Sequence, residues 1–316
     1  MKIAVLDQST LGDDLDLSTL MDDGNEVKVY RNTSEEQIPE HLQGCDVAVI
    51  NKVKLRGDTL CRCSSLKLIC VAATGYDNVD IEYCRQNGIA VCNVVGYSTD
   101  SVAQLTAAMV LYLADHLPEY TESVRSGDYT AGGTANILVP VVHELAGKTW
   151  GIAGYGNIGR KVGAIAEALG CRVIVYKREP VEDAECVTLE ELCTRSDILS
   201  VHLPLNDGTR GAFSREMISL LRKNCIFVNV ARGAVTDEEA LAYALEEGRI
   251  AGLGVDVYSS EPFPESHPFS RIKDRDNVCL TPHMAWGSFE ARKRCLDDIV
   301  ESIRSFREGG TRSRVV

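Results

Sequence analysis

Short apolar runs rich in β-branched residues recur through the first hundred positions, separated by more polar stretches of helix length. Five of these runs predict strands, and they lie at 2–6, 26–30, 46–51, 66–71 and 89–93. Strands that alternate with helical segments are typical of βαβ units, in which a parallel sheet carries helices on its faces. We therefore expect an α/β domain with a parallel sheet in this part of the chain.

A second series of strand patterns follows a long apolar helix pattern. Ser, Thr and Asp at 98–101 can cap a helix over 102–113, whose apolar residues cover most of its circumference, so we expect it to be buried between domains or subunits. The strand patterns lie at 148–153, 172–176, 198–202, 225–230, 252–257 and 278–281. They predict a second doubly wound sheet, followed by a last helix over 289–307.

Composition and charge exclude several classes of protein. The 316 residues suffice for two domains, and 45% apolar with 25% charged residues excludes a disordered chain. Lys and Arg total 33 against 46 acidic residues, so the net charge is -13 and the surface should repel nucleic acid and anionic membranes. An anionic ligand must then bind through a local basic patch or through backbone amides.

The twelve cysteines are scattered and often lie inside apolar runs, which is typical of reduced, buried thiols in a cytoplasmic protein. Their spacing matches no zinc motif, so no metal site is expected. The first residues enter a strand pattern without the features of a signal peptide, and the apolar run at 107–114 is too short to span a bilayer.

A Gly-x-Gly-x-x-Gly segment follows the strand pattern that ends at 153 and leads into a predicted helix over 160–169. Its residues are Gly154, Tyr155, Gly156, Asn157, Ile158 and Gly159. In such a loop the first glycine permits a tight turn, the second lets the backbone approach a pyrophosphate, and the third lets helix and strand pack closely. The helix N-terminus adds unpaired N–H groups. This context predicts a dinucleotide site.

The position that contacts the adenosine ribose carries basic residues. An NAD site usually has Asp or Glu about 20 residues after the glycines, whereas Lys177 and Arg178 follow the strand pattern at 172–176. These side chains suit a 2′-phosphate, so we expect NADP, with NAD as the alternative. A solvated basic pair on a surface loop is the other interpretation.

Three further motifs follow the last three strand patterns, at the ends where ligands of doubly wound sheets bind. They are VNVARG at 228–233, GVDVYSSEP at 254–262 and TPHMAW at 281–286. With the glycine loop, these motifs resemble the signatures of the D-isomer-specific 2-hydroxyacid dehydrogenases, and most closely the glycerate dehydrogenase and hydroxypyruvate reductase group. The segments at 71–80 and 201–205 extend the resemblance over nearly the whole chain.

The resemblance implies roles for several residues of these motifs. Arg232 would bind the carboxylate or carbonyl oxygen of a 2-keto acid with a planar fork that lysine lacks. His283 would be the acid that protonates the developing alkoxide, and Glu261 would orient its ring and favour its charged form. Asp256 would accept the carboxamide N–H of the nicotinamide. Substrate contacts are further expected at Lys52, Thr74 and Gly75, and cofactor contacts at His202, Pro204, Val230 and Ala231.

Several alternatives remain open at this point. Arg232 could be a surface ion-pair partner, Glu261 could merely end a strand, and His202 is the rival to His283 as the acid. The expected reaction interconverts hydroxypyruvate or glyoxylate with D-glycerate or glycolate; another D-2-hydroxyacid dehydrogenase or a 3-phosphoglycerate dehydrogenase is the alternative. A redox-sensing scaffold that binds the dinucleotide is disfavoured, because the Arg, Glu and His are all present.

The resemblance also implies an architecture. A flavodoxin-like substrate domain and a Rossmann cofactor domain would face each other across an active-site cleft. Because the glycine loop starts at 154, we expect the cofactor domain to be inserted at 100–285, and the substrate domain to comprise 1–99 and 286–316. The family resemblance further implies a homodimer joined through the cofactor domain.

Overall fold

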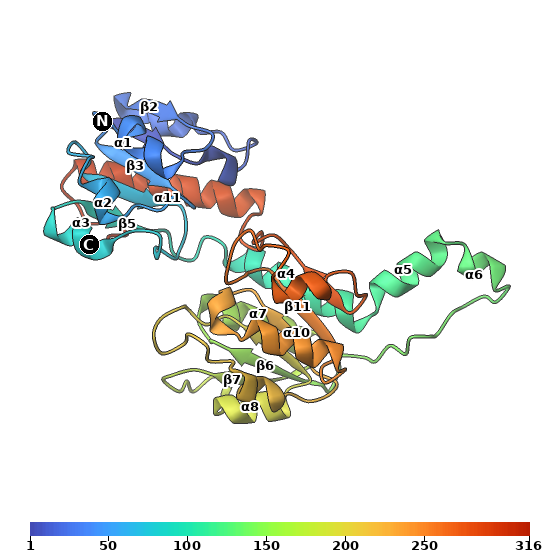
Figure 1. The fold of residues 1–316 in the computed structure, drawn as a ribbon. Coiled ribbons are helices and arrows are strands. Elements are labelled where there is room, and N and C mark those ends of the chain that lie inside the picture. The colour runs from blue at the N-terminus through green and yellow to red at the C-terminus, as the bar shows by residue number, and fades with distance from the viewer. The chain divides into compact units, whose positions relative to one another are not determined.

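The computed structural model describes residues 1–316, and it divides into two compact units (Figure 1). Met1–Ser98 and Gly287–Val316 together form the first, here called the outer unit. Thr99–Trp286 forms the second, here called the inserted unit. Each unit contains one parallel sheet, as the two series of strand patterns predict.

The sheet of the outer unit has the strand order β2-β1-β3-β4-β5, with every neighbouring pair parallel. This is the flavodoxin-like order. Its strands are β1 (Lys2–Val5), β2 (Glu26–Val29), β3 (Val47–Ile50), β4 (Leu68–Val71) and β5 (Ala90–Cys92). The connections hold only short helices: α1 (Ile38–His41), α2 (Gly57–Leu60) and α3 (Ile81–Gln86), with the 3-10 helices η1 (Gln8–Thr10), η2 (Ser18–Gly24) and η3 (Glu35–Gln37).

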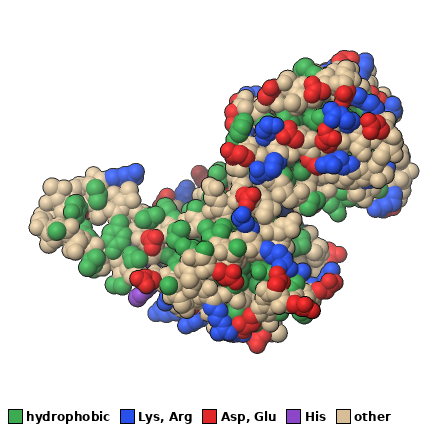
Figure 2. Space-filling view, turned by 180° about the vertical axis from the view of Figure 1, so that it is seen from behind, with side chains coloured by type: hydrophobic (Ala, Val, Ile, Leu, Met, Phe, Trp, Pro, Cys, Tyr) green, Lys and Arg blue, Asp and Glu red, His purple; other side chains and the backbone are tan.

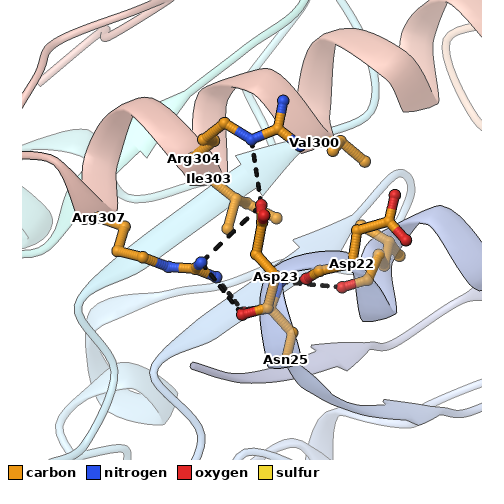
Figure 3. Close-up of a pocket in the computed structure, with 8 residues that line it drawn as sticks. Asp22, Asp23, Asn25, Val300, Ile303, Arg304 and Arg307 are labelled. Carbon is orange, nitrogen blue, oxygen red and sulfur yellow. Dashed lines mark hydrogen bonds and ion pairs between the residues drawn. The ribbon is translucent and has the colours of Figure 1, made fainter.

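The last helix, α11 (Phe289–Arg307), packs against β4 and η2, and its bounds match the predicted range. Near its end it is tied to the segment before β2 (Figure 3). Arg304 Nε lies 3.1 Å from Asp23 Oδ2, and Arg307 donates to the Asp23 carbonyl at 3.3 Å. These pairs join α11 to η2 across the small pocket drawn in Figure 3, so the pocket is part of the packing of α11.

The sheet of the inserted unit has the order β12-β11-β10-β9-β6-β7-β8, again parallel throughout. Six of its strands follow the predicted patterns: β6 (Thr149–Ala153), β7 (Arg172–Tyr176), β9 (Ile198–Val201), β10 (Ile226–Asn229), β11 (Gly252–Val255) and β12 (Val278–Leu280). The seventh, β8 (Glu185–Cys186), is two residues long and was not predicted from the sequence. The order around β6 is that of dinucleotide-binding folds.

Helices cover both faces of this sheet: α4 (Thr99–Ala114), α7 (Asn157–Ala168), α8 (Leu189–Arg195), α9 (Arg215–Ser219) and α10 (Glu238–Glu246). The 3-10 helices η4 (Gly233–Val235) and η5 (Pro268–Arg271) follow β10 and β11. The buried side chains of α4, among them Met109 and Val110, belong to a core shared with α7, β6 and β10. Packing inside its own unit thus accounts for the apolar sequence of α4. No helix of the structure is long and apolar enough to cross a bilayer.

An arm extends from the end of α4 (Figure 1). It comprises α5 (Leu117–Arg125), α6 (Asp128–Ala131) and the segment that leads back to β6, and neither helix buries a residue. Apolar side chains gather on its surface (Figure 2). The most exposed are Val124, Leu138, Val139 and Val141, each with more than 60% of its surface accessible.

All twelve cysteines are free thiols, and nine of them are buried. Burial raises the pKa of Cys84 to about 11 and the pKa values of Cys193 and Cys295 to about 12, because the thiolate loses its hydration. Cys61 is the exposed exception, and Cys186 and Cys279 are half-buried. Most of these side chains therefore act as small apolar core residues.

Candidate active site

The three glycines of the loop between β6 and α7 occupy three different environments. Gly154 has a φ of +99°, and a Cβ at this position would lie 2.7 Å from the His202 backbone. A Cβ at Gly159 would lie 2.1 Å from the Gly154 carbonyl oxygen. At Gly156 a Cβ would meet no atom within 4 Å. The first and third glycines therefore permit close packing, and the second leaves open space beside the backbone.

The start of α7 suits an anion in this open space. Gly156 is the N-cap, no side chain accepts a hydrogen bond from the first turn, and the first turn contains no acidic residue. Backbone N–H groups at such a terminus, together with the helix dipole, attract a phosphate. The loop and helix present here thus fit the pyrophosphate of a dinucleotide.

His202 follows β9 directly and adjoins the glycine loop. Its Nε2 lies 3.0 Å from Ser200 Oγ, which also accepts the indole N–H of Trp150 at 3.0 Å. Because a hydroxyl has one proton and two lone pairs, Ser200 can accept the indole N–H and still form a hydrogen bond with Nε2 in either direction. Nδ1 is shielded from solvent and has no hydrogen-bond partner. A buried polar atom without a partner next to a phosphate-binding loop is consistent with a ligand site.

Burial lowers the pKa of His202 to about 3, because the imidazolium would lose its hydration there. The ring is neutral near pH 7 and is a poor proton donor for a reaction. This argues against His202 as the rival acid.

Lys177 and Arg178 lie in the turn after β7. Lys177 is half-buried, Arg178 is exposed, and neither pairs with an acidic side chain. The nearby Asp183 forms an ion pair with Arg160 of α7, whose guanidinium lies 4.7 Å from the centre of the Tyr155 ring. The pKa of Asp183 is lowered chiefly by its hydrogen bond with Arg160, with a smaller contribution from the charge of Lys177. Asp183, a carboxylate of the same connection, is thus already paired with another arginine.

His283 and Glu261 meet in the structure. Glu261 lies in the loop after β11 and His283 in the turn after β12, and Nδ1 of His283 is 2.6 Å from Glu261 Oε2. The other carboxylate oxygen of Glu261 accepts the N–H of Tyr258 at 3.0 Å. Glu261 is therefore held by its own loop while it contacts the imidazole. A carboxylate at this distance accepts a hydrogen bond from Nδ1 and orients the ring.

Asp256 holds the turn that carries His283. It is fully buried at the end of β11. Its Oδ1 accepts the Thr281 hydroxyl at 2.5 Å and the Met284 N–H at 2.8 Å, and its Oδ2 accepts the Ala285 N–H at 2.9 Å. Desolvation raises the pKa of Asp256, while these hydrogen bonds favour the carboxylate. Sequence reasoning missed this supporting role. The available signal was that Asp256 follows one strand and His283 follows the next strand along the chain.

Arg232 lies in the turn after β10. The side chain of Asn229 fixes this turn through backbone hydrogen bonds, as Asp256 fixes the turn of His283. Asn229, the last residue of β10, accepts the Ala231 N–H and donates to the Arg232 carbonyl, both at 3.0 Å. The guanidinium donates to the Ala231 carbonyl at 2.8 Å and has no acidic partner. Arg232 is therefore not part of an ion pair in this structure, which argues against its interpretation as a surface ion-pair residue. Val230 and Ala231 are buried in this turn, whereas Pro204 is exposed in the loop after β9.

The candidate residues of the outer unit lie in loops at the carboxyl ends of its strands. Asp7, buried after β1, accepts the backbone N–H groups of Asn51, Lys52 and Val53 at 2.5 to 3.1 Å. Desolvation raises the pKa of Asp7, and the three N–H groups oppose that rise. This buried carboxylate fixes the loop that carries Lys52, and sequence reasoning missed it.

The loop after β4 is fixed by a different pair of contacts. Thr74 donates its hydroxyl proton to the Val94 carbonyl at 2.8 Å, and Asn93 donates to the Thr74 carbonyl at 2.7 Å. Thr74 is exposed and Gly75 is half-buried. The backbone around Thr74 and Gly75 is thus ordered by the segment that follows β5 and is reachable from solvent.

Known proteins resemble this chain over most of its length. Residues 107–285 match the family described as "D-isomer specific 2-hydroxyacid dehydrogenase, NAD binding domain". A glycerate dehydrogenase of Methylorubrum extorquens is 37% identical over 286 residues, which cover 90% of each chain. A hydroxypyruvate reductase of Blautia hydrogenotrophica is 34% identical over 318 aligned positions and 98% of each chain.

A solved structure shows the same fold with ligands bound. The D-lactate dehydrogenase from Aquifex aeolicus, complexed with NAD and lactic acid, superposes with a TM-score of 0.85 at 27% identity. The match covers 98% of this chain and 96% of that one. Together with the family match and the full-length relatives, it confirms the resemblance inferred from the motifs. This chain belongs to the D-isomer-specific 2-hydroxyacid dehydrogenases, oxidoreductases that act on a CH–OH group with a nicotinamide dinucleotide.

Proposed function

We propose that the protein reduces hydroxypyruvate or glyoxylate to D-glycerate or glycolate, with NADPH as the preferred reductant. The observation that carries the proposal is the 2.6 Å contact between His283 and Glu261. It supplies an oriented proton donor, and Arg232, on a neighbouring strand end, keeps a guanidinium without an acidic partner. The names of the full-length relatives, a glycerate dehydrogenase and a hydroxypyruvate reductase, favour this pair of substrates.

The residues of the chain would divide the work as follows. A bound nicotinamide supplies the hydride. Arg232 holds the substrate carboxylate through two parallel hydrogen bonds. His283 donates its proton to the alkoxide oxygen that forms as the carbonyl is reduced, and Glu261 keeps the imidazolium oriented. We assign contacts with the rest of the substrate to Lys52 and to the backbone at Thr74 and Gly75.

The preference for NADPH rests on Lys177 and Arg178. Both remain without an acidic partner, and Arg160 already pairs with Asp183. A 2′-phosphate would gain two cations there, whereas a ribose 2′-hydroxyl would find no carboxylate in the usual place. Replacing Lys177 by Asp should therefore reverse the order of kcat/KM for NADPH and NADH. A higher kcat/KM with NADH in the unmodified enzyme would refute the electrostatic argument.

We assign the cofactor to the inserted unit, residues 100–285 in our prediction, and the substrate loops to residues 1–99 with 286–316. We also propose a homodimer joined through the inserted unit. The apolar side chains of the arm support it, because an exposed apolar surface of this kind is typical of a protein–protein contact. The twelve unpaired cysteines favour a cytoplasmic location.

A substrate panel tests the proposal. Glyoxylate, hydroxypyruvate, pyruvate, phenylpyruvate and 3-phosphohydroxypyruvate are each assayed with NADPH and with NADH. We expect the highest kcat/KM for hydroxypyruvate or glyoxylate with NADPH. A higher value for 3-phosphohydroxypyruvate or another keto acid would assign the enzyme to a different substrate, and dinucleotide binding without turnover of any keto acid would favour a sensing scaffold.

A further inference from the structure

Glu238 is a buried carboxylate that the proposed reaction does not use. It is the first residue of α10, and 8% of its side chain is accessible. Oε1 accepts the Ser259 N–H at 2.8 Å, and Oε2 accepts the Ser259 hydroxyl and faces His267 Nε2 at 3.0 Å. All of these partners belong to the segment after β11. Burying a carboxylate is costly, so its three donors must repay the lost hydration.

His267 is fixed as firmly as Glu238. Its side chain is 4% accessible, and its Nδ1 accepts the Phe269 N–H at 3.2 Å. Since Nδ1 is an acceptor, Nε2 carries a proton and donates it to Glu238. The rings of Tyr258, Phe263 and Phe269 surround the imidazole, with centroids 4.9 to 6.0 Å away. His267 therefore has one orientation, in which it holds the carboxylate of Glu238.

The Tyr258–Ser259 peptide lies between this carboxylate and the turn of Arg232. A Cβ at Gly233 would lie 2.1 Å from the Tyr258 carbonyl carbon and 2.2 Å from the Ser259 nitrogen, so the two backbones touch. On the other side, Glu238 binds both the N–H and the hydroxyl of Ser259. The peptide is thereby clamped, and it cannot move without displacing Gly233 or Glu238.

The clamped peptide leads to the proposed acid. Tyr258 donates its N–H to Glu261 at 3.0 Å, and its hydroxyl donates to the Thr281 carbonyl at 2.9 Å, in the turn that carries His283. Glu261 in turn contacts His283. A continuous path of hydrogen bonds and covalent links thus runs from Glu238 through Ser259 and Tyr258 to both members of the acid pair.

We infer that Glu238, supported by His267, is a positioning residue: it fixes the loop at 258–261 so that Glu261 meets the imidazole of His283. Because Gly233 packs on the same peptide, this contact also sets the loop against the turn of Arg232. The role of the pair in the reaction rests on the proposed function. The effect of Glu238 on the pair is measurable without any turnover.

Two substitutions test the inference with different degrees of disruption. Ser259→Ala removes one hydroxyl donor and keeps the Ser259 N–H. Glu238→Gln keeps the size of the side chain, but one of its two ends becomes an NH2 group, so either the Ser259 N–H or the His267 Nε2–H faces another donor. Glu239→Gln is the matched control, because the neighbouring Glu239 is exposed and pairs with Arg271 away from this loop.

The principal measurement follows the ring of His283 by NMR with isotopically labelled histidine, the signal being assigned by its loss in His283→Ala. Glu261→Gln sets the scale, since it removes the partner charge and should shift the midpoint of the His283 titration to lower pH. We expect Glu238→Gln to produce at least half of that shift, Ser259→Ala a smaller one, and Glu239→Gln none. Leu245→Ala, a buried change at the far end of α10, controls for loss of stability and should leave the midpoint unchanged.

Turnover gives the second measurement. With hydroxypyruvate and NADPH, Glu238→Gln should lower kcat at least tenfold, with KM changed less than threefold, and its pH profile should shift in the same direction as the His283 titration. If Glu261→Gln shifts the His283 titration while Glu238→Gln and Ser259→Ala leave it in place, the positioning role is refuted and the proposed acid pair stands. If Glu261→Gln shifts nothing, the pair itself fails and the inference fails with it.

Discussion

Replacing His202, a half-buried residue whose ring nitrogen Nδ1 is shielded from solvent, should make the protein more resistant to mild acid. In the folded protein burial lowers the pKa of this ring from 6.5 to about 3, so the folded state stays unprotonated at pH 5. The unfolded chain has the ordinary value near 6.5 and takes up the proton. Stability from this group is therefore complete above pH 6.5 and is lost as the pH falls toward 3, because the unfolded state binds the extra proton.

The size of the effect follows from the same two values. At pH 5 the solution lies about 1.5 pH units below the pKa of the unfolded ring, which is protonated there, while the folded ring is not. Between about pH 7.5 and about pH 5 this difference lowers the free energy of unfolding by about 2 kcal/mol. A His202→Asn variant keeps a polar side chain but cannot take up this proton. Over the same range its free energy of unfolding should fall by about 2 kcal/mol less than that of the unmodified protein.

Urea unfolding followed by tryptophan fluorescence measures the difference. Trp150 and Trp286 are the two tryptophans of the chain, and both belong to the inserted unit together with His202, so the signal reports the unfolding of that unit. His143→Gln is the matched control, since His143 is exposed in the segment before β6. Equal losses of stability in His202→Asn and the unmodified protein would show that the ring is protonated, or solvated, in the folded state.

Four further changes concern the reaction and the cofactor. Arg232→Lys should lower kcat/KM by about 100-fold while the Kd for NADPH stays the same, since a charge remains but the two-pronged geometry is lost; near-normal kcat/KM would remove Arg232 from the substrate site. Reduction should fall and oxidation should rise with increasing pH, and Glu261→Gln should move the reduction limb of the kcat/KM profile to lower pH; unshifted limbs would contradict the pair. His283→Ala should abolish most of the rate in both directions while dinucleotide binding, measured calorimetrically, survives; strong residual turnover would assign the proton transfer to another group. Gly156→Val should weaken dinucleotide binding at least tenfold with little change in the thermal midpoint, because its side chain enters space that no protein atom occupies; unchanged affinity would place the pyrophosphate elsewhere.

Both sheets could be predicted because parallel strands buried on two faces leave an unmistakable pattern. The eleven predicted runs correspond to β1–β7 and β9–β12, with ends that differ by at most two residues. The two-residue strand β8 lacks an apolar run, since Glu185 is exposed and its side chain forms an ion pair with Arg172 of β7. The helix-length stretches of the outer unit contain only short helices joined by turns, where residues such as Gly12, with a φ of +96°, interrupt helical conformation.

The parts of the site that carry chemistry were recognisable because their residue types are rare in combination, as Arg232, Glu261 and His283 illustrate. The residues that hold them in place were not. Asp7, Asp256 and Glu238 act through backbone N–H groups of segments distant in sequence, and a lone Asp or Glu after a strand has many possible partners. Only the folded backbone reveals which N–H groups a buried carboxylate receives.

The burial of the thiols turns the cysteines into a built-in reporter of folding. Under native conditions Cys61 should react first with a thiol-specific reagent such as a maleimide, because it is exposed while nine others are buried and have little thiolate. The buried thiols become reactive only when their surroundings open. A dye attached at Cys61 would thus label the outer unit selectively, and the slow appearance of further reactive thiols would time the opening of each core without any engineered probe.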